Sequence, residues 1–114
     1  MRVELLFWQG CPSHPQALAM LREQMSSLGL DPREIAVREI ATDEQAAQER
    51  FVGSPTIRID GADAIDPGEQ PPALTCRVYT RRDGRISPTP DPADVRDALS
   101  TALASTASAT ERSD

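Results

Sequence analysis

The first strand and the first helix of this chain meet at a cysteine, and this junction constrains the fold more than any other feature. Residues 2–8, RVELLFW, are rich in β-branched and aromatic residues and are apolar on both faces of an extended strand. Such a strand belongs in the centre of a sheet. Residues 12–30 carry leucine and methionine at helical spacing, with Pro12 suited to the first turn and Gly29 to the end. The sequence therefore predicts a strand-turn-helix unit with Cys11 at the joint.

The remaining pattern predicts an α/β fold with the order β-α-β-α-β-β-α. A second strand is expected over residues 34–40, with Ile35, Val37 and Ile40 buried, followed by a helix over residues 43–50 capped by Thr42 or Asp43. A third strand follows Pro55 and runs through Ile57 and Ile59. Residues 61–72 have the composition of a loop. A fourth strand is expected over residues 73–80, a hairpin turn at residues 81–84, and a last helix over residues 90–103 with Val95, Leu99 and Leu103 facing the core.

The length of 114 residues predicts a single domain, which we place at residues 1–104. Residues 105–114 lack an apolar period and are expected to form a disordered C-terminal tail. The domain is long enough to fold without a structural metal or a disulfide framework.

Charge and targeting signals narrow the class of protein. Eighteen acidic residues face twelve arginines, which gives a net charge of -6 and argues against binding to nucleic acid or to anionic membranes. The N-terminus enters a strand directly, without the pattern of a signal peptide, and no apolar run is long enough to cross a bilayer. We therefore expect a cytoplasmic protein, in which two cysteines are more suited to reactivity, metal binding or burial than to a permanent disulfide.

Two short motifs, placed against these elements, resemble the thioredoxin-like superfamily. Cys11-Pro12-Ser13-His14 stands at the first strand-helix joint, and Ser54-Pro55-Thr56 stands just before the third strand. The resemblance covers residues 2–104 and implies a central mixed four-stranded sheet flanked by helices. The run FVGSPTIRIDG with the later CRVY is similar to small bacterial thioredoxin-like proteins that are sometimes labelled as related to alkylmercury lyase.

The position of Cys11 predicts a reactive thiol. The free N–H groups and the positive end of the dipole at a helix N-terminus favour an anion, so we expect the pKa of Cys11 to be lowered. The resemblance implies the same role, that of an exposed attacking thiol. The alternative is a cysteine that only packs at the end of a strand.

His14 stands where thioredoxin-like proteins usually carry the second cysteine of Cys-x-x-Cys. One helical turn separates it from Cys11, so its imidazole could stabilise the thiolate or transfer a proton. The alternative is a partly buried histidine whose nitrogens bond to backbone groups.

A disulfide formed by Cys11 must then be resolved elsewhere, and Cys76 is the only internal candidate. The resemblance places Cys76 near the middle of the last strand, two strands away from the first, so a direct bond is not assured. A low-molecular-weight thiol or a protein thiol is the alternative resolver, and a small buried hydrophobe is the alternative role for Cys76 itself.

The resemblance also implies a set of substrate-binding residues. Pro55 is expected in the cis form beside Cys11, with Ser54 offering its backbone to an extended peptide or a glutathione-like partner. Trp8 is expected at the rim of the site, or alternatively in the core. The residues assigned to substrate binding are Trp8, Pro12, Ser54, Pro55 and Thr56.

Three functions fit these residues. The first is a thiol-disulfide oxidoreductase without a cofactor, whose partner is a low-molecular-weight thiol or a protein disulfide. The second is a protein of the mercury type that binds a soft metal through Cys11 and Cys76, with His14 as a further ligand, or a relative of organomercurial lyases. The third is a non-enzymatic interaction domain with a vestigial cysteine.

Overall fold

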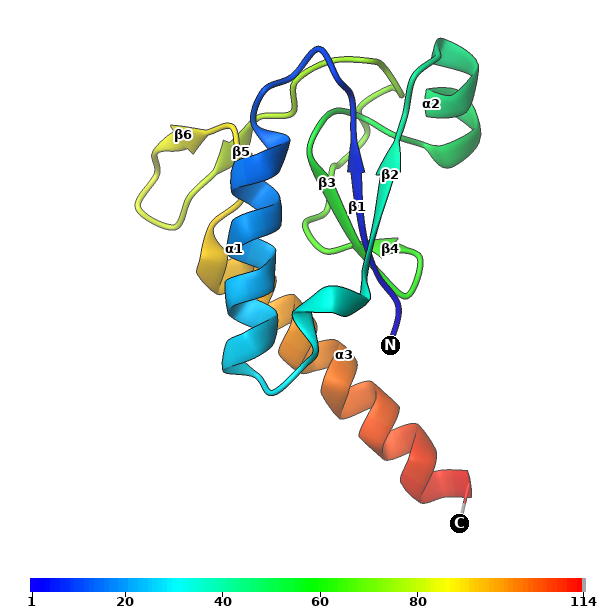
Figure 1. Ribbon diagram of the computed structural model, residues 1–114, viewed down its shortest axis with the longest axis vertical. Helices are drawn as coiled ribbons and strands as arrows, with labels where there is room; N and C mark the ends of the chain where they lie inside the picture. Colours follow the sequence, from blue (N-terminus) through cyan, green and yellow to red (C-terminus); the bar gives the residue numbers. More distant parts are fainter. Residues whose placement is uncertain (114) are drawn as a thin grey trace.

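A mixed four-stranded sheet with strand order β2-β1-β3-β4 forms the centre of the molecule (Figure 1). The computed structural model describes residues 1–113, with side chains described to residue 105. Its elements are β1 (Val3–Phe7), α1 (His14–Ser27), the 3-10 helix η1 (Pro32–Glu34), β2 (Ile35–Glu39), α2 (Asp43–Glu49), β3 (Thr56–Ile59), β4 (Ala62–Asp63), β5 (Tyr79–Thr80), β6 (Ile86–Ser87) and α3 (Pro92–Ser113). The predicted α/β class and the mixed four-stranded sheet are confirmed.

β1 is the central strand that its sequence predicts. It pairs in parallel with β2, Leu5 opposite Val37, and antiparallel with β3, Leu5 opposite Ile57. One face of the sheet packs against α1 and α3 in a core that contains Val3, Leu5, Ala17, Leu21, Met25, Ile57, Ile59, Val95 and Leu99. The other face forms a smaller core that contains Leu6, Ile40, Ala46 and Phe51. Removing a fully buried leucine such as Leu5 from this arrangement would cost about 2–5 kcal/mol.

Helix α1 begins at His14, two residues later than the sequence predicts. The backbone N–H of Cys11 donates to the carbonyl oxygen of Trp8 at 3.0 Å, so a turn separates the strand from the helix. The Ser13 side chain forms no capping hydrogen bond, and Pro15 takes the place in the first turn that was expected for Pro12. The predicted stop is confirmed, because Gly29 has a φ of 78° and the Leu30 N–H bonds to the Met25 carbonyl in a Schellman motif.

Three positions that were expected to be buried differ from the sequence prediction. Ile35, at the start of β2, is half-buried. Val37 is 45% exposed, because β2 is an edge strand of the sheet and is paired only on its β1 side. Leu103 is half-buried at the far end of the packed part of α3, while Val95 and Leu99 are fully buried as expected. The cap of α2 is confirmed: the Thr42 hydroxyl accepts from the Gln45 N–H at 3.1 Å.

The fourth strand of the sheet is not the segment predicted from the sequence. β4 lies within residues 61–72, which were expected to be loop, and pairs with the end of β3. Most of residues 73–80 lies outside the sheet, and only Tyr79–Thr80 forms a strand, in a separate hairpin with β6 across the predicted turn at residues 81–84. The four residues that β4 and β5 contribute are too few to produce a clear alternating pattern.

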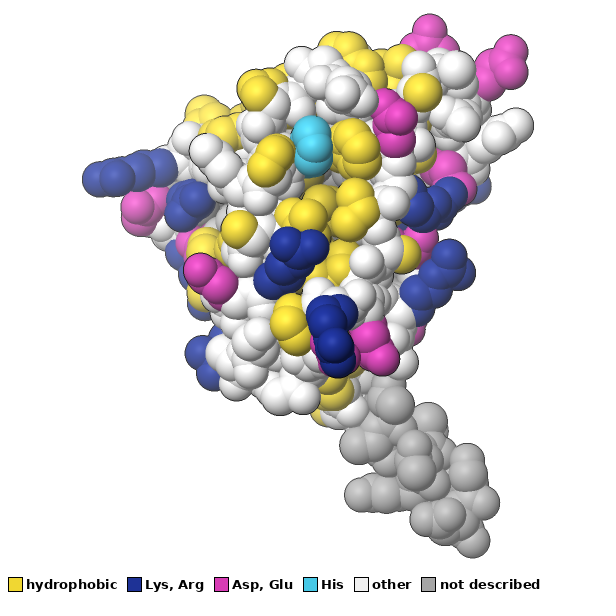
Figure 2. Space-filling model, in the orientation of Figure 1, with side chains coloured by type: hydrophobic (Ala, Val, Ile, Leu, Met, Phe, Trp, Pro, Cys, Tyr) yellow, Lys and Arg dark blue, Asp and Glu magenta, His cyan; other side chains and the backbone are white. Residues whose placement is uncertain are grey.

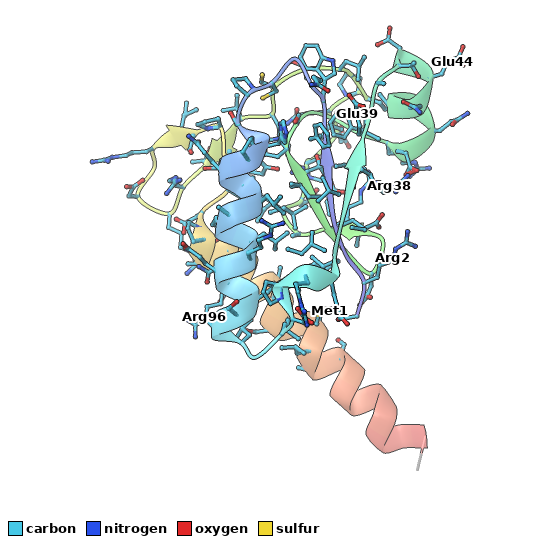
Figure 3. All side chains as sticks on the ribbon, in the orientation of Figure 1. Met1, Arg2, Arg38, Glu39, Glu44 and Arg96 are labelled. Carbon is cyan, nitrogen blue, oxygen red and sulfur yellow. The ribbon has the colours of Figure 1, made fainter. Side chains whose placement is uncertain are left out.

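A line of ion pairs crosses the sheet and reaches the segment that carries the second cysteine. Arg38 on β2, shown in Figure 3, donates to the buried Glu4 carboxylate at 2.9 Å. Arg58 donates to Asp63 at 2.8 Å, and Arg77 donates to the same carboxylate at 3.4 Å. Arg77 is only 5% exposed, so its charge depends on these partners. The network therefore fixes the position of Arg77 next to Cys76.

The C-terminal helix continues along the stretch for which a disordered tail is expected. The side chains after residue 105 and the whole of residue 114 lie outside the described residues, so this expectation stays a prediction. Among the described helices, none combines the length and the apolar character needed to span a membrane.

Candidate thiol site

Cys11 lies between β1 and α1, at the end of the sheet where the segment before β5 also passes (Figure 1). Its sulfur is 3.5 Å from the carbonyl oxygen of Ser54, which precedes Pro55. The Ser54-Pro55 peptide bond is cis, as the resemblance implies. The exposed thiol expected from the sequence is not found, because the Cys11 side chain has no exposed surface. The sulfur lies outside the two apolar clusters of the described residues, and its hydrogen bond is the contact with Ser54.

Ser54 occupies an unusual position beside this sulfur. Its backbone N–H donates to the Thr75 carbonyl at 2.8 Å, and its carbonyl accepts from the Arg77 N–H at 2.8 Å. The backbone groups that were expected to bind an extended partner are therefore already bonded to another segment of the same chain. The Ser54 side chain is completely buried, and its Oγ has no hydrogen-bond partner among the described residues.

Cys76 lies opposite Ser54 in an isolated parallel bridge. This position differs from the one that the resemblance implies, since Cys76 is not in the four-stranded sheet. Side chains alternate along the segment: Arg77 and Tyr79 point inward, while Cys76 and Val78 are exposed. The buried-hydrophobe alternative for Cys76 is therefore wrong.

The pKa values of the two thiols shift in opposite directions. Burial opposes ionisation of Cys11 and is the largest single influence on its pKa. Four donors counteract burial and together lower the pKa of Cys11 below its ordinary value: the Cys76 thiol, the Ser13 backbone N–H and the hydroxyls of Ser13 and Ser54, which can donate once Cys11 has lost its proton. Hydrogen bonding to Cys11, with burial and the negative charge on Cys11, raises the pKa of Cys76. Of the two thiols, Cys11 is therefore the one that loses its proton first as the pH rises.

Ionisation of Cys11 would provide a hydrogen-bond acceptor for two side chains. The Ser13 hydroxyl is free because it does not cap α1, and the Ser54 hydroxyl is buried without a partner. Both hydroxyls can donate a hydrogen bond to an anionic sulfur. The sulfur of a protonated thiol is only a weak acceptor for them. An unpaired buried hydroxyl costs about 1–3 kcal/mol, so Ser54 favours the thiolate.

His14 is half-buried and contacts a backbone group, as expected for a histidine whose ring nitrogens bond to the backbone. Its Nδ1 lies 3.3 Å from the carbonyl oxygen of Cys11, and its ring stacks on Phe7 with centroids 4.2 Å apart. Figure 2 shows the single histidine side chain at the surface among hydrophobic side chains. A role for His14 in proton transfer stays a prediction.

The other residues assigned to substrate binding are divided between the surface and the interior. Pro12 is exposed, and Trp8 is half-buried against the smaller core, with its indole over Gly10. Pro55 and Thr56 are fully buried, and the Thr56 hydroxyl donates to the Gly53 carbonyl at 2.7 Å. Their role in substrate binding stays a prediction.

Sequence reasoning missed the residues that hold Cys76 in place. The Arg77 side chain donates to the Ile65 carbonyl at 2.6 Å and lies over the Tyr79 ring, 4.6 Å from its centroid. The Tyr79 hydroxyl donates to the Pro55 carbonyl, and burial raises the pKa of Tyr79. The alternation in CRVYT could have placed Arg77 and Tyr79 on one face, but nothing in the sequence marks an arginine as buried.

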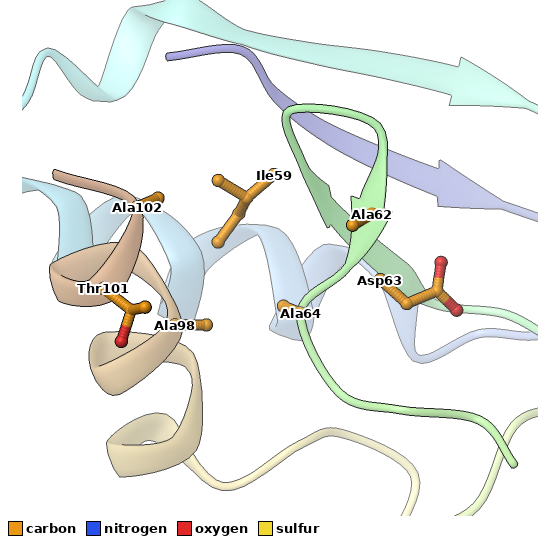
Figure 4. Close-up of a pocket in the computed structure, with 7 residues that line it drawn as sticks. All are labelled: Ile59, Ala62, Asp63, Ala64, Ala98, Thr101 and Ala102. Carbon is orange, nitrogen blue, oxygen red and sulfur yellow. The ribbon is translucent and has the colours of Figure 1, made fainter. Parts of the chain in front are cut away.

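The cavity in Figure 4 lies between α3 and the β3-β4 hairpin, with Ile59, Ala98 and Ala102 in its wall. None of the predicted site residues lines it. Within the described part of the chain, no group of three or more His, Cys, Asp or Glu side chains is arranged to hold a metal ion.

A scan against protein-family models and searches of curated proteins and of solved structures find no match to this chain.

Proposed function

We propose that this chain is a thiol-disulfide exchange protein that alternates between a Cys11/Cys76 dithiol and an internal disulfide. One observation carries the proposal: the Cys11 sulfur lies 3.5 Å from the carbonyl oxygen of Ser54, the residue that is bridged to Cys76. The thioredoxin-like resemblance supports the same chemistry. Thiolates are the reactive form of cysteine in such exchange, and a neighbouring thiol completes a two-electron couple.

The test is the equilibrium of the wild-type chain with mixtures of reduced and oxidised glutathione. Free thiols are then alkylated and the protein is digested with trypsin without reductant. Cleavage after arginine places Cys11 in peptide 3–22 and Cys76 in peptide 59–77. We expect these two peptides to be linked, and the linked fraction to rise with the share of oxidised glutathione.

The single variants Cys11→Ser and Cys76→Ser serve as matched controls, because neither can form the internal bond. If the wild type yields only glutathione adducts at every ratio, the exchange proposal fails. A non-enzymatic interaction domain would also leave Cys11 ionising like a model thiol near pH 8.5, as followed by the ultraviolet absorbance of the thiolate.

Binding of a soft metal ion is a second candidate, favoured by the same pair of neighbouring sulfurs. Two thiolates suit linear coordination of Cu(I) or Hg(II). Titration of the reduced chain with either ion would be compared with Cys76→Ala, which keeps Cys11. An affinity that does not change on loss of Cys76 would contradict this candidate.

A further inference from the structure

The two sulfurs of the exchange site differ in access. Cys11 has no exposed surface, whereas Cys76 is exposed on the face of its segment that also presents Val78. A disulfide or thiol of a partner molecule approaching from solvent therefore meets Cys76 first. The sequence alone suggested the opposite order, with Cys11 as the exposed thiol.

The segment that carries Cys76 is fixed against the residue next to Pro55. Two backbone hydrogen bonds of 2.8 Å, on either side of Cys76, join Thr75 and Arg77 to Ser54. The Tyr79 hydroxyl adds a third contact, to the Pro55 carbonyl. These contacts hold Cys76 next to Ser54, and the Cys11 sulfur contacts the same residue. The two cysteines are therefore already close together in the reduced protein.

We infer that Cys76 is the sulfur that exchanges with the partner molecule, and that Cys11 reacts only with Cys76. The inference rests on the proposed function and deepens it by dividing the roles of the two cysteines. The mixed disulfide with the partner thus forms on Cys76 and not on Cys11.

The chemistry balances in both directions. In the oxidised protein, a partner thiolate attacks the Cys76 sulfur, the Cys11–Cys76 bond breaks, and Cys11 leaves as the thiolate. A second partner thiolate then releases Cys76, so two thiols are oxidised to one disulfide and the protein gains two electrons. In reverse, Cys76 loses its proton to solvent and its sulfur attacks a partner disulfide, whose S–S bond breaks and releases the first partner thiolate. The Cys11 thiolate then attacks the Cys76 sulfur of the mixed disulfide, forms the internal bond and expels the second partner thiolate. A leaving thiolate that is already stabilised departs faster, which suits the position of Cys11.

The test traps the mixed disulfide on single-cysteine variants with the aromatic disulfide DTNB and with the small reagent methyl methanethiosulfonate. We expect Cys11→Ser, which keeps the exposed Cys76, to form the DTNB adduct at least about tenfold faster than Cys76→Ser, which keeps the covered Cys11. The difference should shrink with the smaller reagent, because access limits Cys11. Circular dichroism checks that both variants fold.

A matched control moves the thiol along the same exposed face. In the double variant Cys76→Ser/Val78→Cys the number of cysteines is unchanged, but the thiol at position 78 lies beyond the Ser54 bridge. Its DTNB adduct should persist, whereas wild type should release both thionitrobenzoate groups as it forms the internal disulfide. Equal release from the double variant would overturn the role of the bridge.

The failures of the two proposals are distinguishable. If wild type forms the linked peptides 3–22 and 59–77 but the DTNB adduct accumulates as fast or faster on Cys11 of Cys76→Ser, the division of roles is wrong and the exchange function stands. If no linked peptides form, the exchange function itself fails.

A second experiment on the wild type decides the same question if a variant does not fold. The protein is treated briefly with a small amount of DTNB, quenched with acid and mapped by peptide. Early adduct on peptide 59–77 supports the inference, and early adduct on peptide 3–22 overturns it.

Discussion

Ser54 contacts the thiol site through both its backbone and its side chain. It accepts hydrogen bonds at its carbonyl from the Arg77 N–H and from the Cys11 thiol, while its own hydroxyl is buried and has no partner in the described part of the chain. A hydroxyl in this state is an unused donor beside a sulfur that can become an acceptor by losing its proton. The side chain therefore couples the protonation of Cys11 to the packing around Pro55.

The substitution Ser54→Ala tests this coupling. Loss of a hydrogen bond to a charged group is worth about 1.5–3 kcal/mol, so the pKa of Cys11 should rise by about one unit or more. The ultraviolet absorbance of the thiolate, titrated in a Cys76→Ser background, measures the shift. Ser26→Ala, an exposed serine on α1, is the control and should leave the titration unchanged. An unchanged titration in Ser54→Ala would show that the hydroxyl does not reach the thiolate.

At the scale of elements, the close approach of two segments sets the site. Gly53 has a φ of 152°, and a Cβ at this position would lie 2.9 Å from the Arg77 Cβ and 3.0 Å from its backbone nitrogen. Only glycine lets the chain before β3 come this close to the segment before β5. The bridge between Ser54 and Cys76 therefore depends on a residue that is in neither cysteine's own segment.

We expect Gly53→Ala to push the Cys76 segment away from Ser54. The variant should lose about 1–3 kcal/mol of unfolding free energy in urea and form the internal disulfide several-fold more slowly. Gly61→Ala is the matched control, because Gly61 also has a positive φ, 84°, but a Cβ there meets no atom within 4 Å. It should lose stability through backbone strain, by about 1 kcal/mol, without slowing disulfide formation. Equal slowing in both variants would contradict the role of the close approach.

The elements with strong periodicity could be predicted from the sequence, and the site geometry could not. The residues of β1, α1 and β3 show the hydrophobic periodicity that is typical of a strand or a helix. Gly29 and Thr42 are residue types that commonly end and begin helices. The position of Cys76 depends instead on a single bridge, formed by a segment that is too short to have a period. The burial of Cys11 follows from that packing, so the sequence could place the thiol at the helix but not predict what covers it.

At the scale of the whole molecule, the two sulfurs make folding stability depend on pH. The pKa of Cys11 is lower in the folded chain than the value near 8.5 expected when unfolded. Between the folded pKa and about pH 8.5 the native state holds fewer protons than the unfolded state, so the unfolding free energy rises with pH there. This contribution is fully present above about pH 8.5 and is lost as pH falls through the folded pKa of Cys11.

Cys76 acts in the opposite direction at higher pH. Its folded pKa is raised, so above about pH 8.5 the native state keeps a proton that the unfolded chain releases, and stability falls. Urea denaturation of reduced wild type at several pH values should therefore show a rise and then a fall relative to the double variant Cys11→Ser/Cys76→Ser. A wild-type curve parallel to that of the double variant over this range would contradict the opposite pKa shifts of the two thiols.

The separation of the two cysteines along the chain has a mechanical consequence. Cys11 and Cys76 lie 65 positions apart, and the chain between them contains α1, η1, β2, α2, β3 and β4. Oxidation would close a covalent ring around most of the domain, and a ring of this size lowers the entropy of the unfolded chain by the equivalent of about 4 kcal/mol. The oxidised protein should then resist proteases and heat better than the reduced protein does.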